Sequence, residues 1–292
     1  MEFWIIVGEG GGYEEIKQVS LDHADIVPGG IHHTTMRMDD LVFTMGHNGQ
    51  TKLFVCGEQT APPDVFLLWG HYNEVFEGIS DRLTSLGARS LNGIEGKRVV
   101  CSKLLTALVL EKENLPQAKT MIVTESTPAK LVVEQVGLPA VLKPSDGAQG
   151  SGVVLLNTEE EIAEYLAAIP KENGMSTIAQ EFIATSKGTD FRVCMADDQV
   201  LYAIQRISNN PDEFRSNVHL GGYYRSFEPD DSVLDLCRRV VKAVGLRICG
   251  IDLLRTEDGY VIGEVNCTPG MPDYAVEDGS YRRAMLRLIT TA

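Results

Sequence analysis

The sequence contains no long hydrophobic run. In its 292 residues, no segment approaches the ~20 consecutive apolar residues that a membrane-spanning helix requires. The first apolar run, residues 3–7, is too short for the hydrophobic part of a signal peptide and follows no basic residue. This run predicts a first β-strand, and the sequence predicts neither a membrane-spanning segment nor a secretion signal.

Closely spaced cysteine pairs are also lacking. The six cysteines have no C-x-x-C spacing, and most have apolar neighbours. They are Cys56, Cys101, Cys194, Cys237, Cys249 and Cys267. Buried, reduced thiols are therefore favoured over disulfides. Together with the lack of a secretion signal, this predicts a cytoplasmic protein.

The chain has no excess of positive charge. Its formal net charge is −15, so nonspecific binding to nucleic acid or to an anionic membrane is unfavourable. A local basic cluster could still bind a small anion such as ATP. The sequence therefore predicts no nucleic-acid partner and no membrane partner.

What the chain does contain is a series of helix and strand signals in three regions, without internal repeats. A chain of this length exceeds the usual size of one hydrophobic core. Residues 1–91 predict a small open α/β domain, and residues 92–176 predict an alternating α/β unit. Residues 177–292 are expected to open with a strand at 177–182 and to continue through further strands and helices. These patterns predict a mixed α/β fold.

Several helix ends carry specific signals. Ser102 can cap a helix, and Thr127 followed by Pro128 is typical of an N-cap with proline at the first helical position. Thr158 with Glu161 has the spacing of a capping box. All three signals lie in the second region and predict helices after each of these positions.

Three oxygen-bearing side chains converge on a hairpin near the C-terminus. A three-residue loop at 257–259 places Asp252 opposite Glu264, and Asn266 lies two residues further along the same face. Two buried carboxylates that close repel each other unless a cation lies between them. Because their neighbours are apolar, a Mg²⁺ site is favoured over a solvated surface hairpin.

A glycine-rich loop follows a lysine at a predicted strand end. Lys143 precedes Gly147, Gly150 and Gly152, and a second strand starts after them. Backbone N–H groups in such a loop can bind phosphate, and lysine adds a point charge. The spacing matches neither standard nucleotide-binding glycine motif, so an ordinary hairpin loop fits this segment equally well.

Basic and amide side chains form another group. Arg192, Arg206 and Arg215 are suited to bidentate contact with phosphate or carboxylate, and Asn217 adds a neutral donor. In an acidic protein, grouped arginines can also simply offset neighbouring acids. The segment 180–183 could present backbone groups and an apolar face to adenine, although an ordinary strand end fits it equally well.

Taken in order, these segments closely resemble the ATP-grasp superfamily, and within it the ribosomal protein glutamate ligase-like, RimK-type group. The resemblance extends from about residue 92 to 270. It implies an ATP-grasp fold of the α/β (α+β) class, in which ATP is sandwiched between two α+β subdomains. The implied boundaries are an N-terminal pre-ATP-grasp domain at 1–91, a central subdomain at 92–176 and a C-terminal subdomain at 177–292.

The resemblance also implies site residues. Those implied to bind the nucleotide are Lys103, Lys143, Gly150, Ser151, Gly152, Glu181, Phe182, Asp190 and Arg192. Among them, Glu181 and Phe182 resemble the hinge at adenine, and Asp190 resembles an acidic residue near the ribose. The implied catalytic residues are Arg206, Arg215 and Asn217, and the implied metal ligands are Asp252, Glu264 and Asn266.

The function implied by the resemblance is an ATP-dependent carboxylate–amine ligase. It uses two Mg²⁺ ions, for which Mn²⁺ could substitute, and forms an acyl phosphate before releasing ADP and phosphate. The implied partners are small-molecule or peptide carboxylates and amines, with an amino acid such as glutamate as one substrate. A phosphotransferase and a non-catalytic ATP-binding protein are the alternatives, and a homo-oligomer stays open.

Two segments fall outside the familiar pattern. They are the N-terminal region, with its glycine turn at 8–12 and its His32-His33 pair, and the segment 271–274. The two histidines are expected in a solvent-exposed loop rather than in a metal site. Since acceptor contacts often lie near the second segment in the family, the substrate stays undetermined at this point.

Overall fold

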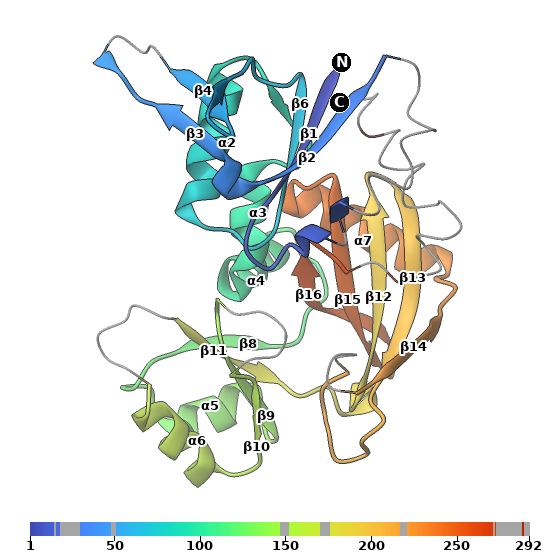
Figure 1. The fold of residues 1–292 in the computed structure, drawn as a ribbon. Coiled ribbons are helices and arrows are strands. Elements are labelled where there is room, and N and C mark those ends of the chain that lie inside the picture. The colour runs from blue at the N-terminus through green and yellow to red at the C-terminus, as the bar shows by residue number, and fades with distance from the viewer. Residues whose placement is uncertain are drawn as a thin grey trace.

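The protein is built around three main β-sheets and a group of helices between them (Figure 1). The computed structural model describes residues 1–14, 16–17, 30–47, 51–146, 152–169, 176–216 and 221–270, together with Pro272 and Leu288. In this part of the chain no helix is long and apolar enough to cross a membrane. The mixed α/β class expected from the sequence is confirmed.

The N-terminal sheet is parallel, and its two central strands are buried on both faces. Its strands, in the order β2-β1-β6-β7, are β2 (His32–Arg37), β1 (Glu2–Val7), β6 (Val65–Trp69) and β7 (Arg89–Ser90). Alternate side chains of β1 and β6 point to opposite faces. One set packs on helix α2 (Glu74–Ser85), and the other packs on the third sheet. Burial on both faces accounts for the continuous apolar runs of these strands.

The histidine pair lies on a strand and not in a loop, so that prediction was wrong. His32 and His33 pair with Glu2 and Phe3 of β1 in parallel register. The His33 ring stacks on Phe3 with centroids 5.7 Å apart, while His32 is exposed. The strand forms because it pairs in parallel with β1. This partner is distant in the sequence, so the residues around the histidines do not indicate it.

A small antiparallel sheet projects beyond the N-terminal sheet. It follows the short 3₁₀ helix η2 (Met38–Asp40) and consists of β3 (Leu41–Thr44), β4 (Lys52–Val55) and β5 (Glu58–Gln59). Figure 1 shows this hairpin extending away from the rest of the molecule. It therefore lies far from the sheets described below.

The second sheet is antiparallel and has two helices on one face. Its order is β10-β9-β11-β8, with β10 (Val154–Leu156), β9 (Ala140–Pro144), β11 (Thr177–Glu181) and β8 (Thr120–Val123). The helices are α5 (Ala129–Val136) and α6 (Glu159–Ala167), and their apolar faces cover the sheet. The strand expected to open the third region, β11, instead pairs with β8 and β9 of this sheet.

Two of the three helix signals mark the residues that cap the helices. Ser102 accepts a hydrogen bond from Leu105 N at the start of α4 (Lys103–Lys112). Thr158 accepts one from Glu161 N at the start of α6. In α5 the cap is Pro128 rather than Thr127, a shift of one residue.

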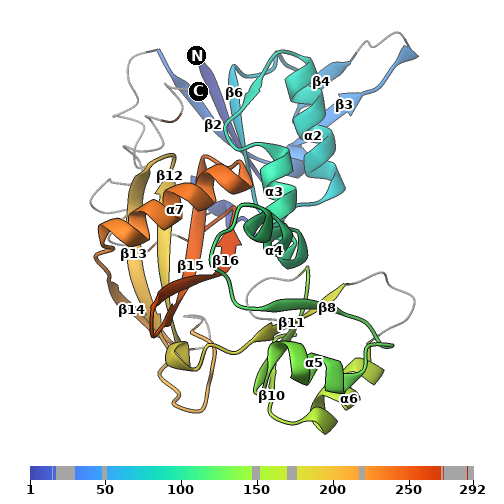
Figure 2. The ribbon, with the colours of Figure 1, turned by 180° about the vertical axis from the view of Figure 1, so that it is seen from behind.

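The third sheet is antiparallel and carries most of the candidate site. Its order is β14-β13-β12-β15-β16, with β14 (Tyr223–Ser226), β13 (Gln199–Ile207), β12 (Thr189–Ala196), β15 (Ile248–Thr256) and β16 (Gly259–Asn266). A short 3₁₀ helix, η4 (Ala184–Ser186), precedes it. Helices α7 (Asp231–Val244), α3 (Ile94–Cys101) and α4 pack against it, as the rear view in Figure 2 shows.

The face of the third sheet that is turned away from these helices is apolar at one end and polar at the other. Near Ala196 and Ile248 it is apolar, because the N-terminal sheet covers it. Further along the same strands, alternate residues on that face are Arg192 on β12, Arg206 on β13 and Asp252 on β15. The polar side chains therefore begin beyond the apolar contact with the N-terminal sheet.

The hairpin formed by β15 and β16 contains a bulge. Thr256 pairs with Gly259 across a two-residue turn, and this register continues to the pair Leu253 and Ile262. The register then shifts, so that Asp252 lies opposite Glu264 and Gly263 has no partner residue across the ladder. The pair predicted from the sequence is confirmed, although the turn is one residue shorter than expected.

Candidate active site

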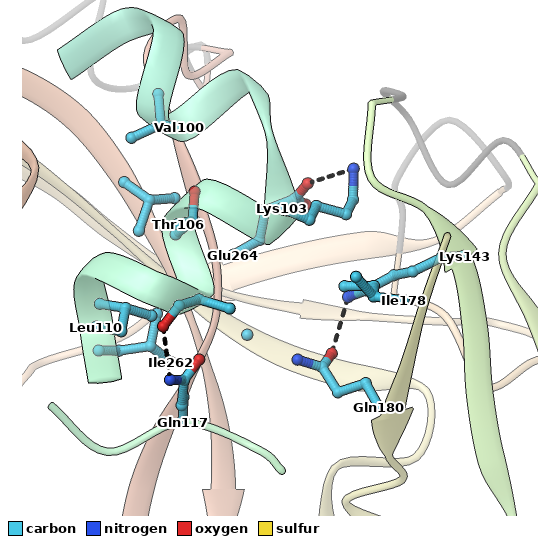
Figure 3. Close-up of a pocket in the computed structure, with 13 residues that line it drawn as sticks. Val100, Lys103, Thr106, Leu110, Gln117, Lys143, Ile178, Gln180, Ile262 and Glu264 are labelled. Atoms are coloured by element: carbon cyan, nitrogen blue, oxygen red, sulfur yellow. Dashed lines mark hydrogen bonds and ion pairs between the residues drawn. The ribbon is translucent and has the colours of Figure 1, made fainter. Parts of the chain in front are cut away.

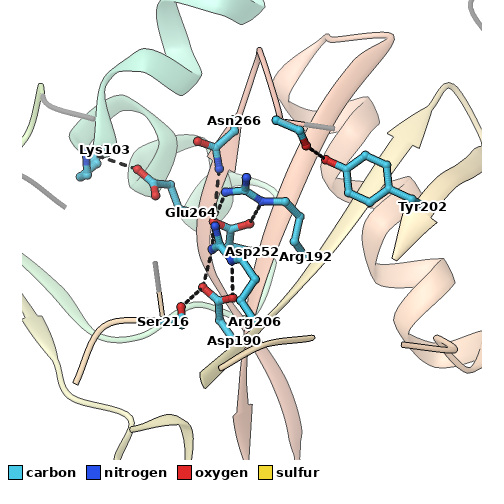
Figure 4. Close-up of polar contacts among 10 residues, drawn as sticks. Lys103, Asp190, Arg192, Tyr202, Arg206, Ser216, Asp252, Glu264 and Asn266 are labelled. Carbon is cyan, nitrogen blue, oxygen red and sulfur yellow. Dashed lines mark hydrogen bonds and ion pairs between the residues drawn. The ribbon is translucent and has the colours of Figure 1, made fainter. Parts of the chain in front are cut away.

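Asp252 lies at the centre of a network of ion pairs (Figure 4). Arg192 donates from Nε to Oδ1 at 2.7 Å and from Nη2 to Oδ2 at 2.8 Å, and Arg206 Nη2 donates to Oδ2 at 2.8 Å. The Asp252 side chain is buried, with 4% of the residue exposed. Burial alone would raise the pKa of Asp252, but the two guanidinium groups outweigh it and the net pKa is lowered.

Asp190 holds Arg206 from the other side. Arg206 donates to Asp190 through Nε at 2.7 Å and through Nη2 at 2.5 Å, which is a bidentate pair. Ser216 Oγ donates to the same carboxylate at 2.6 Å. Burial raises the pKa of Asp190, although Arg206 opposes that effect. The formal charges of two carboxylates and two guanidinium groups cancel within this cluster.

The predicted metal ligands lie together but already have partners. Asn266 Nδ2 donates to Asp252 Oδ2 at 3.3 Å, and Glu264 Oε1 lies 3.3 Å from the ammonium group of Lys103. Carboxylate and amide oxygens are the donors that Mg²⁺ prefers, so the chemistry of these three residues fits that ion. Among the described residues, no three His, Cys, Asp or Glu side chains converge to hold a metal. The metal assignment therefore stays a prediction.

Lys143 lies on the second sheet, across from Lys103 and Glu264 (Figure 3). Its Nζ donates to Gln180 Oε1 at 2.8 Å, and Gln180 Nε2 donates to Thr120 Oγ1 at 3.0 Å. Burial lowers the pKa of Lys143 to about 8, while Glu264 acts in the opposite direction. A buried ammonium group with a neutral partner is poised to accept an anion.

A cavity lies between α4, the second sheet and β16. Lys103, Lys143 and Glu264 line it, and its volume is about 20 Å³. Pockets that hold ligands of drug size are roughly 300–1,000 Å³. The cleft as it stands therefore has room for little more than a water molecule, and a nucleotide would require the Lys143 and Lys103 contacts to rearrange.

The start of α4 is anchored to the end of β9. Lys103 N donates to Ser145 O at 2.9 Å, and the hydroxyl oxygens of Ser102 and Ser145 are 3.0 Å apart. Ser145 is fully buried. This contact fixes Lys103 beside the end of β9, and sequence spacing gave no sign of it because 43 residues separate the two serines.

The structure describes three of the remaining predicted nucleotide residues, Glu181, Phe182 and Gly152. Glu181 N donates to Lys119 O at 2.9 Å, and the Phe182 ring meets Phe214 edge-on with centroids 6.4 Å apart. Gly152 has a φ of +70°, and a Cβ there would lie 3.0 Å from Pro144. Gly150, Ser151 and Asn217 lie outside the described residues.

Three predicted residues have partners that their expected roles did not include. Asp190, expected near a ribose, holds Arg206. Arg192, expected at the nucleotide, holds Asp252. Arg215 Nη2 pairs with Glu213 Oε2 at 2.8 Å, so its guanidinium group is turned toward its own segment. Ser216, which carried no assigned role in the sequence, orients Asp190.

Comparison with known proteins places the chain in a family. A family model described as the RimK-like ATP-grasp domain matches residues 101–280, more than half of the chain. The chain belongs to this family. The match confirms the resemblance inferred from the ordered motifs, and with it the class of ATP-grasp ligases. Enzymes of that class use ATP and Mg²⁺.

Individual relatives carry more specific names. A probable alpha-L-glutamate ligase of Haemophilus influenzae is 28% identical over 215 residues, which cover 70% of this RimK-like chain and 70% of that protein. A probable alpha-L-glutamate ligase of Pasteurella multocida is 28% identical over 212 residues, covering 69% and 67%.

Solved structures confirm the fold. The ATP-grasp ligase PsnB, complexed with a minimal precursor, superposes with a TM-score of 0.71 at 21% identity and covers 99% of each chain. D-alanine–D-alanine ligase from Bacillus anthracis superposes with a TM-score of 0.70 at 15% identity, covering 100% of this chain and 97% of that one. At these identities the likeness concerns the ATP-grasp fold alone.

Proposed function

We propose that this RimK-like ligase activates a substrate carboxylate as an acyl phosphate and joins it to the amine of an amino acid. The observation that carries the proposal is the pair Asp190–Arg206, a buried guanidinium group held on the polar face of the third sheet. A fixed cation of this kind can stabilise the oxyanion that forms when an amine attacks the acyl phosphate. Glutamate is the amino acid we propose, because the relatives are named as glutamate ligases.

The lysines on the two sides of the cleft have a separate role in this proposal. Lys143 and Lys103 lie on opposite walls of one cavity, and both are positioned to neutralise the phosphates of ATP. Each would exchange its present partner, Gln180 or Glu264, for phosphate oxygens. Closure of the cleft around the nucleotide would then exclude water from the acyl phosphate.

The metal belongs to the same proposal. Asp252, Glu264 and Asn266 would hold two Mg²⁺ ions, or Mn²⁺ in their place, and the bound metal would offset charge on the transferred phosphoryl group. The residues themselves orient one another, because Asn266 donates to Asp252 and Lys103 neutralises Glu264 until nucleotide arrives. The three-part domain division, the cytoplasmic location and any homo-oligomer stay predictions.

The test is ADP release measured with Mg²⁺, ATP and pools of candidate carboxylates, including small acids and peptides, with and without amino acids. We expect release that requires both a carboxylate and an amine, with glutamate as the best single amino acid. Release without amine, together with a stable phosphorylated product, would instead identify a phosphotransferase. Nucleotide binding without any release would identify a non-catalytic ATP-binding protein.

A further inference from the structure

Two cysteines lie in contact beside the candidate site. Cys101 ends α3, and Cys267 directly follows β16; their sulfur atoms are 3.6 Å apart although 166 residues separate them in sequence. Both are free thiols. The contact joins α3, the helix that leads into α4, to the end of β16, the strand that carries Glu264 and Asn266.

A buried lysine holds one of these sulfur atoms in place. Lys97 Nζ donates to Cys267 Sγ at 3.4 Å and to Gly70 O at 2.5 Å, and only 2% of the residue is exposed. Cys267 Sγ is therefore contacted by both Lys97 and Cys101. Cys101 is partly exposed whereas Cys267 is buried, so an oxidant would reach the pair from the side of Cys101.

The two cysteines flank residues of the proposed site on both sides. Ser102 and Lys103 follow Cys101 directly, and Lys103 reaches Glu264 at 3.3 Å. Asn266, which donates to Asp252, directly precedes Cys267. A covalent link between the two sulfur atoms would therefore shift the chain next to Lys103 and next to Asn266 at the same time.

We propose that Cys101 and Cys267 are a redox modification site, at which a hydroperoxide converts the two thiols into a reversible disulfide. One S–S bond forms, and two S–H bonds and the O–O bond of the oxidant break. The two sulfur atoms together lose two electrons, and the hydroperoxide is reduced to an alcohol and water, or to two waters for hydrogen peroxide. A dithiol reductant restores both thiols.

The modification is expected to lower turnover. A disulfide requires the sulfur atoms to approach to about 2.05 Å, so the contact must shorten from 3.6 Å. Misplacement of reacting groups by about 1 Å can reduce rates by about 10²-fold. We therefore expect at least a ~10-fold fall in amine-dependent ADP release; this consequence rests on the proposed function, whereas the disulfide does not.

The experiment treats the full-length native protein with hydrogen peroxide, blocks remaining thiols and digests with trypsin. We expect a linked pair of peptides, residues 99–103 with residues 256–282, that disappears on treatment with dithiothreitol. The matched control is Cys56→Ser, which removes an exposed cysteine in the turn between β4 and β5 and should still form the link. Cys101→Ser and Cys267→Ser should each abolish it.

The outcomes separate the two parts of the inference. Loss of the Cys101 thiol without the linked peptides, or a link that appears only in urea, would overturn the modification site. A link that leaves turnover unchanged would overturn its effect on the active site. Recovery with dithiothreitol distinguishes the disulfide from methionine oxidation, which that reductant does not reverse. Because the linked peptides are detected by mass, they remain informative even if no ligase substrate is found.

Discussion

Arg206 Nη2 lies 2.8 Å from Oδ2 of Asp252, the residue predicted to bind metal. The same guanidinium group is held by two further bonds to Asp190, so its contact with Asp252 is the weaker of its two attachments. Arg206 can therefore leave Asp252 and remain fixed in direction by Asp190. The Asp252 carboxylate can therefore pair with Arg206 before nucleotide binds and with a metal afterwards.

The first prediction concerns Arg206. Removal of the side chain in Arg206→Ala would leave the buried Asp190 without its cationic partner, a change that typically costs about 3–5 kcal/mol. Arg206→Lys keeps the charge but loses the bidentate geometry. We expect kcat for ADP release to fall by about 10²-fold in Arg206→Lys with little change in the KM for ATP, as for a lost transition-state contact.

Arg225→Lys is the matched control. Arg225 lies on the neighbouring strand β14 and donates to Gln205, so it makes the same kind of strand-to-strand contact away from Asp252. Its kinetics should stay near wild type. A large rise in the KM for ATP with unchanged kcat in Arg206→Lys would reassign Arg206 to ground-state binding.

The second prediction concerns metal binding without nucleotide. Both oxygens of Asp252 accept hydrogen bonds from arginines, and Glu264 is paired with Lys103. A divalent ion would add positive charge to a cluster that is already balanced. Mn²⁺ titrated by electron paramagnetic resonance should therefore bind weakly to the protein alone. It should bind at least ~10-fold more tightly once a non-hydrolysable ATP analogue supplies negative charge, and equal affinity in the two titrations would contradict the argument.

The third prediction concerns Glu264. If Glu264 and Asp252 only repelled each other, Glu264→Gln would stabilise the protein. Glu264 instead pairs with Lys103 in a partly exposed contact. Such pairs contribute about 0–1 kcal/mol. The melting temperature of the nucleotide-free protein should therefore change little, while ADP release with Mg²⁺ should be abolished. Glu257→Gln, in the exposed turn of the same hairpin, is the control; near-wild-type turnover in Glu264→Gln would end the metal assignment.

The sequence predicted local relationships well because they depend on spacing. Asp252 and Glu264 were expected opposite each other across a three-residue loop, and they are opposite each other. The turn has two residues rather than three, and the extra residue Gly263 in β16 restores the predicted register. The helix starts at Ser102 and Thr158 were also visible locally, because each cap bonds a backbone group three residues away.

Partners distant in sequence could not be predicted in this way. Asp190 and Arg206 meet because β12 and β13 pair antiparallel in one register, which the sequence does not specify. The strand β11 joined the second sheet because its hydrogen-bonding partners lie in the preceding region. The contact between Lys103 and Glu264 likewise depends on how α4 packs beside β16. The types of side chain in the site were therefore predictable, but their pairings were not.

The fourth prediction concerns ATP affinity. Lys143 is buried at the cavity with Gln180 as its hydrogen-bond acceptor, so Lys143→Met should keep the packing and remove the charge. We expect isothermal titration at about pH 7 to show at least ~10-fold weaker binding of ATP with Mg²⁺. Lys130→Met is the control, because Lys130 is an exposed lysine of α5, on the sheet that carries Lys143, and is paired only with Glu134 among the contacts described. Unchanged affinity in Lys143→Met would remove the lysine from the nucleotide site.

The last prediction follows from the lowered pKa of Lys143. Burial brings it to about 8 from an ordinary value of 10.5, so the folded protein loses this proton at lower pH than the unfolded chain does. Between about pH 8 and about pH 10.5 the unfolded state then binds more protons, and the contribution of Lys143 to stability rises with pH. The full effect is on the order of 3 kcal/mol, at 1.36 kcal/mol per pKa unit. Tyrosines and cysteines also titrate in this range, so the measurement is the difference between wild type and Lys143→Met in urea unfolding midpoint at about pH 7 and about pH 10. We expect the wild type to gain stability relative to the variant at the higher pH. If the midpoints of wild type and variant differed by the same amount at both pH values, burial would not disfavour the charged form of Lys143.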